Sequence, residues 1–234
     1  MTYLMMSSLN TGKNIFISRL LTSQSPFHSL AQHDYKIYHE SLIDIEPVSF
    51  QVVQNYEAVF FYSRTAIQYF FEKKPYKTDV AYGVMGQPSA KAFSENCGYK
   101  PDIIGDGNLD LLCQEILRAW AGKTILFPQA KVSLKSVESR LPNQDCVPII
   151  IYNNSIKTEI NTPDCDIVLL TSPLNAEAYL AHFDIDNKLV LSIGSTTADY
   201  ISRKTGLSTA YCKEPSMTSL YSLLLEHLNL RAKS

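Results

Sequence analysis

The hydrophobic positions of the chain fall into short, fully apolar runs that alternate with longer segments of mixed polarity. Ala58–Phe61, Ile167–Leu170 and Leu189–Leu191 are such runs, as expected for strands that are buried on both faces of a sheet. The segments that begin at Ser63 and Ser172 place apolar residues at helical spacing behind a hydroxyl that can cap the helix. This alternation predicts an α/β protein with parallel sheets flanked by helices.

Several other segments fit the same alternation. Val147–Tyr152 is rich in β-branched residues and is expected to form a strand, while helices are expected over Phe27–His33 and Ser133–Leu141. Residues 1–12 are polar and irregular after a Met-rich start, so we expect a mobile or short lead-in there. Gly105–Asp110 begins like a dinucleotide-binding fingerprint but ends in Asp, and we interpret it as a loop before a helix.

The chain carries this strand–helix pattern twice. Gly86–Ala90 matches Gly194–Ala198 at an offset of 108 residues. Further matches follow in the same order, pairing Phe61–Arg64 with Leu170–Pro173 and Ile37-Tyr38 with Ile151-Tyr152. Two copies are too few for a solenoid. They predict two similar α/β domains with a cleft between them.

Composition narrows the class of protein further. With 234 residues, 45% of them hydrophobic, the chain is long enough for two modest domains, and its net charge of −2 gives no support to a nucleic-acid partner. The five cysteines show neither CxxC nor metal-ligand spacing, and an odd number excludes a complete disulfide framework. No basic leader followed by an apolar run is found, and no stretch is long enough to span a bilayer. We therefore expect a cytoplasmic protein with no membrane partner.

Known catalytic motifs are missing from the sequence, but one pattern recurs at its strand-to-helix turns. There is no HExxH, GxSxG or Walker loop. Hydroxyl or amide side chains instead stand at the turns, namely Ser63, Ser89, Gln129, Ser172, Ser195, Thr196 and Thr197. Each alone is most simply a helix cap, but parallel strands bring such turns to one edge, where helix N–H groups bind anions. Arg64 and Lys131 are as well explained by solvated charges as by contacts to a polycarboxylate or phosphate ester.

Six stretches together resemble the uroporphyrinogen III synthase family. They are Tyr62–Ala66, Gly86–Ala90, Phe127-Pro128, Ile151-Tyr152, Thr171–Pro173 and Ile193–Ala198. They occur in the family's order from about Asn14 to Leu228, and the Gly194-Ser195-Thr196-Thr197-Ala198 stretch is the most specific.

The resemblance implies an enzyme of haem and tetrapyrrole biosynthesis, a hydro-lyase without cofactor or metal. Its small-molecule substrate would be hydroxymethylbilane, a linear tetrapyrrole with eight carboxylates, which is cyclised to uroporphyrinogen III with loss of water and inversion of the terminal pyrrole ring. The implied fold has two α/β domains joined by a two-stranded extended connection, with the active site in the inter-domain cleft. On this chain, one domain would combine residues 1–37 and 158–234, and the other would span 46–148. Residues 38–45 and 149–157 would connect them, and a monomer is expected.

The resemblance also implies roles for particular residues. Tyr152 matches the family's tyrosine that is proposed to assist loss of the hydroxyl, while Thr196 and Thr197 match its paired threonines. Ser172, Ser63 and Ser89 match turns that contact the substrate. The chain departs from the family after Phe127-Pro128, where Ala130 and Leu134 replace a common glycine and arginine, so Lys131 is expected to take over carboxylate contacts.

Two other functions remain compatible with the same residues. A non-catalytic two-domain binding protein for an anionic small molecule would share the fold, the cleft and the helix-start amides. A transferase or isomerase of phosphorylated substrates would share the architecture.

Overall fold

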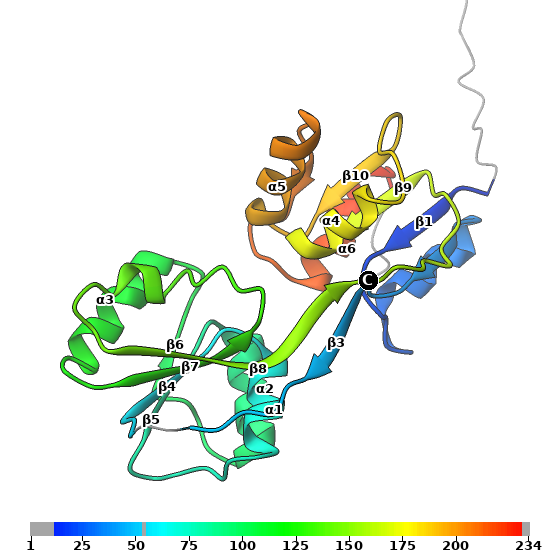
Figure 1. Cartoon of the computed structure of the whole chain (residues 1–234). Coiled ribbons are helices and arrows are strands. Elements are labelled where there is room, and N and C mark those ends of the chain that lie inside the picture. Colours follow the sequence, from blue (N-terminus) through cyan, green and yellow to red (C-terminus); the bar gives the residue numbers. More distant parts are fainter. Residues whose placement is uncertain (1–11, 53–54, 231–234) are drawn as a thin grey trace, which may run out of the picture. The chain divides into compact units, whose positions relative to one another are not determined.

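A computed structural model describes residues 12–52 and 55–230 of the chain, so the expected lead-in over residues 1–12 lies almost wholly outside the described residues. The chain divides into two compact units, each drawn with its own sheet in Figure 1. Unit 1 combines residues 1–44 and 156–234, and unit 2 comprises residues 45–155. The chain therefore passes from one unit to the other twice. Each unit is described separately.

Unit 1 contains a five-stranded parallel sheet in the order β11-β10-β9-β1-β2. Its strands are β1 (Asn14–Ile17), β2 (Lys36–His39), β9 (Ile167–Leu170), β10 (Leu189–Ser192) and β11 (Ala210–Tyr211). All four residues of the central strand β9 are buried, as its apolar run predicted.

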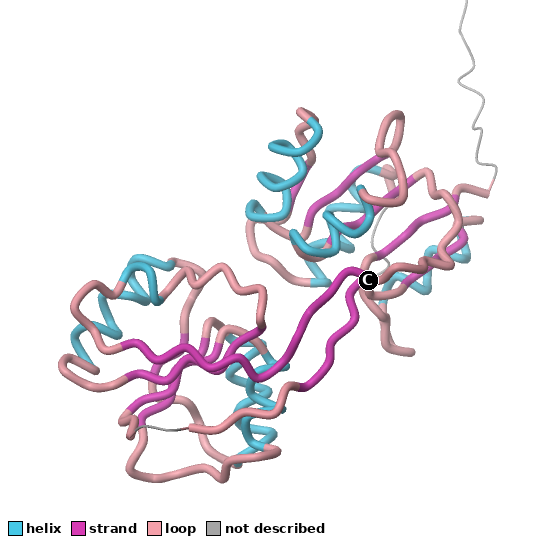
Figure 2. Tube along the Cα trace, viewed as in Figure 1, coloured by secondary structure: helices cyan, strands magenta, loops and turns pink. Residues whose placement is uncertain are grey.

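Helices cover both faces of the unit 1 sheet. In Figure 2 the helices are cyan and the strands are magenta. They are the 3₁₀ helix η1 (Pro26–His33) and the α-helices α4 (Pro173–Leu180), α5 (Ser195–Thr205) and α6 (Met217–His227). On one face, Phe27 of η1 and Leu224 of α6 pack in a common apolar cluster. On the other, Tyr179 of α4 and Ile201 of α5 do the same. The sheet thus has two hydrophobic cores, one on each side.

Unit 2 contains a six-stranded sheet in the order β3-β8-β7-β4-β5-β6, with parallel pairing from β8 to β6. Its strands are β3 (Ile43–Pro47), β4 (Ala58–Phe61), β5 (Ala81–Val84), β6 (Ile103–Ile104), β7 (Ile125–Ala130) and β8 (Cys146–Ile156). Its helices are α1 (Arg64–Phe71), α2 (Gln87–Cys97), α3 (Leu109–Ala119) and the 3₁₀ turn η2 (Glu138–Arg140). Ile67 of α1 and Phe93 of α2 lie in the core on one face, while Ile116 of α3 lies in the core on the other.

The strand registers show that the two units share one topology. In unit 1, β9 lies between β10 and β1, and in unit 2, β4 lies between β5 and β7. In unit 1, Leu189 pairs with Ile167, and in unit 2, Ala81 pairs with Ala58. Ala81 lies 108 residues before Leu189, and Ala58 lies 109 residues before Ile167. The predicted internal duplication is therefore present in the structure.

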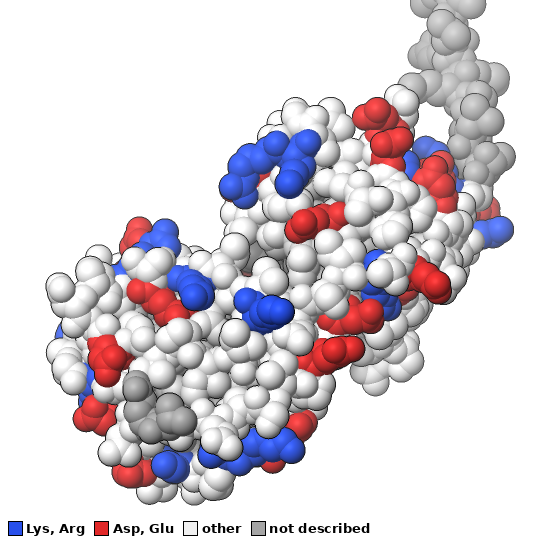
Figure 3. Space-filling view, viewed as in Figure 1, with Lys and Arg blue, Asp and Glu red and all other residues white. Residues whose placement is uncertain are grey.

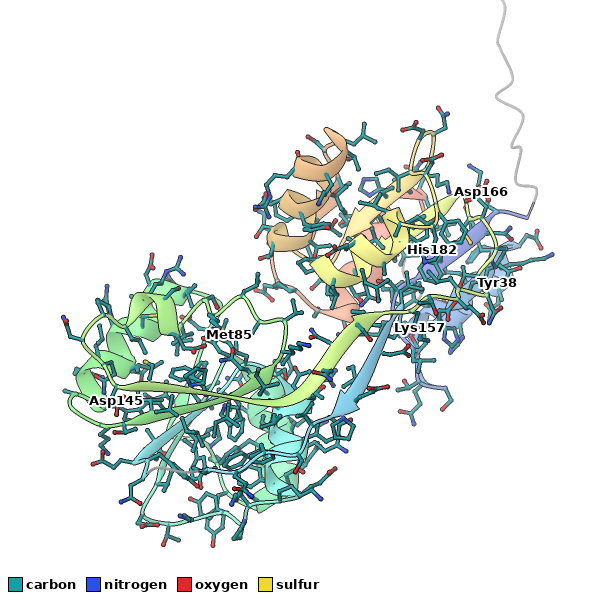
Figure 4. The ribbon with its side chains drawn as sticks, in the orientation of Figure 1. Tyr38, Met85, Asp145, Lys157, Asp166 and His182 are labelled. Atoms are coloured by element: carbon teal, nitrogen blue, oxygen red, sulfur yellow. The ribbon has the colours of Figure 1, made fainter. Side chains whose placement is uncertain are left out.

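One predicted match within this duplication is wrong. Tyr38 pairs with Phe16 of β1, whereas Tyr152 pairs with Ala130 at the far end of β7. The β8 residue at the position of Tyr38 is Val147, which pairs with Leu126. Tyr38, labelled in Figure 4, is therefore not the counterpart of Tyr152. An Ile-Tyr dipeptide alone carries too little information to define register, because register depends on the pairing of the whole strand.

The helix predicted over Ser133–Leu141 is also wrong. This segment is a loop that ends in the short turn η2. Lys135 lies in the left-handed region with φ of 50°, which a continuous right-handed helix does not allow. Val137 and Glu138 instead donate their backbone N–H groups to the Tyr62 hydroxyl, both at 3.1 Å. The loop is thus held by a tertiary contact that the local sequence does not encode.

The surface carries both charge signs. In Figure 3, basic and acidic side chains are interspersed over the visible face, in keeping with the net charge of −2. Within the described residues, every helix is too short or too polar to cross a membrane.

Candidate active site

Ser63 stands at the carboxyl end of β4 and begins α1. Its side-chain oxygen accepts a hydrogen bond from the N–H of Ala66 at 3.1 Å, which confirms the predicted cap. Ser172 is its counterpart in unit 1, where its hydroxyl accepts from the N–H of Asn175 at 3.1 Å and begins α4. The two units therefore start equivalent helices in the same way.

Tyr152 lies directly beside Ser63 in unit 2. The two hydroxyl oxygens are 3.0 Å apart, although 89 residues separate them in the sequence. The backbone carbonyl of Tyr152 accepts a hydrogen bond from the N–H of Lys131 at 2.9 Å, which holds its strand against the end of β7. The structure thus brings together three residues that the sequence predicted separately.

The surroundings of the Tyr152 phenol keep it in its neutral, proton-bearing form. Its side chain is largely buried, with 8% of the residue exposed, and the ring of Tyr69 packs edge-on against it at 6.0 Å. Burial raises the pKa of Tyr152 above its ordinary value, and the hydrogen bond with Ser63 opposes this in part. A neutral phenol at this position can donate its proton or a hydrogen bond.

The start of α5 in unit 1 presents backbone N–H groups at the carboxyl end of β10. Gly194 precedes the helix, and its carbonyl accepts from Thr197 and Ala198, both at 3.2 Å. The N–H groups of Ser195 and Thr196 lie in the first turn, where the helix has no carbonyl to accept their hydrogen bonds. Thr197 is 2% exposed, whereas the side chains of Ser195 and Thr196 are exposed.

The matching start of α2 in unit 2 differs in one respect. Gly86 accepts from Ser89 and Ala90 at 3.0 Å, as Gly194 does from its counterparts, and Ser89 is buried. Pro88 occupies the position of Thr196, and proline has no N–H group. The start of α2 therefore offers one N–H donor fewer than the start of α5.

The two predicted cations lie at the same edge of the unit 2 sheet, and both are exposed. Arg64 is the first residue of α1, and Lys131 follows the last residue of β7. Exposed cations at these positions can reach an anion without the large cost of burying a charge. Their role as substrate contacts stays a prediction.

A second polar group lies at this edge, and of its three members only Gln129 was among the polar residues that the sequence analysis named. We call it the Glu138 cluster, and it consists of Tyr62, Gln129 and Glu138. The Tyr62 hydroxyl donates to Glu138 Oε2, and Gln129 Nε2 donates to Glu138 Oε1, both at 3.3 Å. Gln129 is 2% exposed, and its Oε1 is the one buried side-chain oxygen or nitrogen of the described residues that has no hydrogen-bond partner. Only the fold of the loop brings Glu138 there, so the sequence held no signal for it.

The Glu138 cluster predicts a particular pH dependence of stability. Burial raises the pKa of Glu138 above its ordinary value, so the folded protein binds this proton more tightly than the unfolded chain does. Its contribution to stability is therefore complete below the unfolded pKa, and is lost as the pH rises through the folded pKa. Glu138→Gln cannot titrate, and its amide can donate to Gln129 Oε1. The variant should melt increasingly above wild type as the pH rises from about 4, the ordinary pKa range of a Glu carboxyl.

Fluorescence of Trp120 is the measurement for this prediction. It is the single tryptophan of the chain, is 2% exposed and lies in unit 2 with the Glu138 cluster. The control is Glu95→Gln, because the side chain of Glu95 is 63% exposed and lies outside the Glu138 cluster. Parallel melting curves for Glu138→Gln and wild type at every pH would contradict the prediction.

The chain is similar to known proteins of one family. A family model described as uroporphyrinogen-III synthase HemD matches residues 27–222. The structure resembles the crystal structure of uroporphyrinogen-III synthetase from Helicobacter pylori 26695, with 20% identity, a TM-score of 0.68, and coverage of 92% of this chain and 99% of that one. It also resembles a mutant uroporphyrinogen III synthase from Thermus thermophilus, with 13% identity, a TM-score of 0.61, and coverage of 93% and 99%. At these identities the two structures show that the fold is shared.

No match was found among curated protein sequences. Within the described residues, no three His, Cys, Asp or Glu side chains come together as a group that could hold a metal ion. The family model nevertheless covers most of the chain, from η1 to α6, and includes Ser63, Tyr152 and the start of α5. The chain therefore belongs to the uroporphyrinogen-III synthase family.

Proposed function

We propose that this protein converts hydroxymethylbilane to uroporphyrinogen III, with loss of water and inversion of the terminal pyrrole ring. The observation that carries the proposal is the family match over residues 27–222. It places the protein among cyclising enzymes of porphyrin biosynthesis, and a cytoplasmic location is part of the same proposal.

The first chemical step requires a proton for the departing hydroxyl, and Tyr152 is the proposed donor. Its proton moves to the hydroxyl of the terminal hydroxymethyl group, the carbon–oxygen bond breaks, and water leaves with the bonding electron pair. The lone pair of the adjacent pyrrole nitrogen supplies the electrons, which leaves an azafulvene cation. The neutral state of the Tyr152 phenol supports this role.

Backbone N–H groups at helix starts are the proposed binding sites for the substrate carboxylates. The start of α5 offers the N–H groups of Ser195 and Thr196, and the start of α1 offers those of Arg64 and Thr65. Ser89, Lys131 and Ser172 are further proposed contacts. Fixed amide dipoles hold anions without many buried lysines, which fits the net charge of −2.

Incubation with hydroxymethylbilane tests the proposal. The product is oxidised and its isomers are separated, and wild-type protein should give mainly the type III isomer, faster than spontaneous closure. Mainly type I isomer at the spontaneous rate would instead favour the non-catalytic binding protein for an anionic small molecule.

The role of the α5 start can be tested by three substitutions. Thr196→Ala and Thr197→Ala should each lower activity about fivefold without abolishing it, because each hydroxyl supplies about one hydrogen bond and the N–H groups remain. Thr196→Pro also removes an N–H group, yet it copies the position of Pro88 in α2, where the helix tolerates proline. It should raise KM for hydroxymethylbilane more than Thr196→Ala does.

Measurement of kcat and KM for the three variants decides between hydroxyl and amide binding. Circular dichroism confirms that each variant is folded. Equal KM values for Thr196→Pro and Thr196→Ala would show that this N–H group does not hold the substrate. Complete inactivity of folded Thr197→Ala would instead assign the hydroxyl a direct part in the chemistry.

A further inference from the structure

We propose that α1 positions the Tyr152 phenol, with Ser63 donating its hydroxyl proton to the Tyr152 oxygen and Tyr69 packing against the ring. This inference rests on the proposed function. It assigns Ser63 a different role from the carboxylate contact that the family resemblance implies.

The hydrogen-bond count at Ser63 determines how the two hydroxyls can interact. The Ser63 oxygen accepts from the N–H of Ala66 at 3.1 Å and lies 3.0 Å from the Tyr152 oxygen. A serine hydroxyl carries one proton. If Ser63 gives that proton to the Tyr152 oxygen, the proton of Tyr152 is left to point at the substrate. The opposite direction would occupy the Tyr152 proton with Ser63.

The same direction suits the reaction as it proceeds. When Tyr152 gives its proton to the departing hydroxyl, its oxygen becomes a phenolate. A hydrogen bond from Ser63 to that anion is charge-assisted, and is stronger than the bond to the neutral phenol. The interaction therefore grows in the transition state, as catalysis requires.

The remaining contacts leave the phenol little freedom. The Tyr69 ring meets the Tyr152 ring at 6.0 Å with an interplanar angle of 61°. Ser63 and Tyr69 are supplied by the same helix, one at its cap and the other in its last turn. On the strand side, the N–H of Lys131 holds the Tyr152 carbonyl at 2.9 Å. The hydroxyl, the ring and the backbone of Tyr152 are thus each held by a separate contact.

Loss of the Ser63 hydroxyl should also be visible without substrate. Since the Ser63 hydrogen bond lowers the pKa of Tyr152 against the effect of burial, its removal should raise that pKa further. Protein labelled with ¹³C at the tyrosine Cζ atoms allows this measurement. The Tyr152 signal is assigned by its absence in Tyr152→Phe, and is then followed toward alkaline pH.

The variants are chosen to separate positioning from helix capping. Ser63→Ala and Ser63→Gly both remove the hydroxyl, but glycine at a helix cap costs much less stability than alanine does. Ser63→Thr restores a hydroxyl at the same site. Ser216→Ala is the matched control, because Ser216 caps α6 in unit 1 by accepting from Ser219 at 3.0 Å.

The proposal predicts that Ser63→Ala and Ser63→Gly lower kcat by about tenfold, with KM changed less than about twofold. Ser63→Ala and Ser63→Gly should also raise the pKa of Tyr152. Ser63→Thr and Ser216→Ala should keep kcat and this pKa at their wild-type values. A raised KM with unchanged kcat would overturn the proposal and return Ser63 to carboxylate binding. If wild-type protein makes no type III isomer, the proposed function fails, and the NMR arm still decides. In that case, an unchanged Tyr152 pKa in Ser63→Ala overturns the positioning role, and a raised one supports it.

Discussion

Tyr152→Phe is expected to slow formation of the type III isomer at least about tenfold, which corresponds to about 1.4 kcal/mol of activation free energy. The substitution removes one oxygen atom and keeps the ring that packs against Tyr69. A phenol has a reference pKa of about 10 and can donate a proton while remaining neutral at physiological pH. Phenylalanine cannot donate, so the hydroxyl of the substrate would have to leave without this acid. The measurement is kcat with hydroxymethylbilane.

Tyr82→Phe is the matched control for this prediction. Tyr82 lies in the same unit, is 1% exposed, and its hydroxyl accepts a hydrogen bond from the N–H of Lys77 at 3.1 Å. Its loss removes a buried phenol oxygen near the start of β5, away from the strand-to-helix turns that form the candidate site. Tyr82→Phe should keep wild-type kcat. Equal kcat for the two folded variants would leave Tyr152 a packing residue and the site a binding surface without a general acid.

Gly105→Ala is expected to destabilise unit 2 by about 3 kcal/mol and to lower its melting temperature by more than about 10 °C. A Cβ atom on Gly105 would overlap the carbonyl oxygen of Met85 and lie 3.0 Å from Cδ2 of Leu112. Met85, labelled in Figure 4, directly follows β5, so the obstacle is backbone that cannot rotate away. The change would push apart the turns that begin α2 and α3.

Gly86→Ala tests whether this effect depends on close contact. Gly86 lies across the same contact, but a Cβ atom there would be 3.5 Å from the Gly105 carbonyl oxygen, an ordinary contact distance. Its φ of 176° is extended backbone that any residue adopts. We expect a loss of about 1 kcal/mol or less, of the size seen for alanine at a helix cap. Trp120 fluorescence follows unit 2 in both variants, and similar losses would contradict the prediction.

The sequence by itself was sufficient for the buried strands and for the duplication of the α/β unit. Runs such as Ile167–Leu170 are apolar on both faces, and only a strand in the interior of a covered sheet buries every residue of such a run. Capping is equally local, because the cap oxygen and the N–H that it accepts from are three residues apart. Ser63 and Ser172 were therefore predicted correctly as caps, whereas α2 and α5 begin at Gly86 and Gly194 without a side-chain cap.

Register and loop conformation depended on the tertiary structure. The Ile-Tyr dipeptides at Tyr38 and Tyr152 are alike, yet the partner strands align them differently, since pairing energy is summed over the whole strand. The segment Ser133–Leu141 has a pattern compatible with a helix. It forms a loop because the Tyr62 hydroxyl binds the N–H groups of Val137 and Glu138, and Tyr62 is more than seventy positions away in the chain.

For the candidate site, the sequence identified single residues, and the tertiary structure decided which of them are in contact. The family resemblance identified Tyr152 and Ser63 separately, because each lies in its own short stretch of sequence that resembles the family. That their hydroxyls lie 3.0 Å apart was decided by β8 returning beside β7 and by α1 starting at the end of β4. The sequence analysis named Gln129, but no local signal joined it to Tyr62 and Glu138, since the three residues come from separate segments. Hydrogen bonds between distant segments depend on how strands and loops pack, and that packing is a property of the whole folded unit.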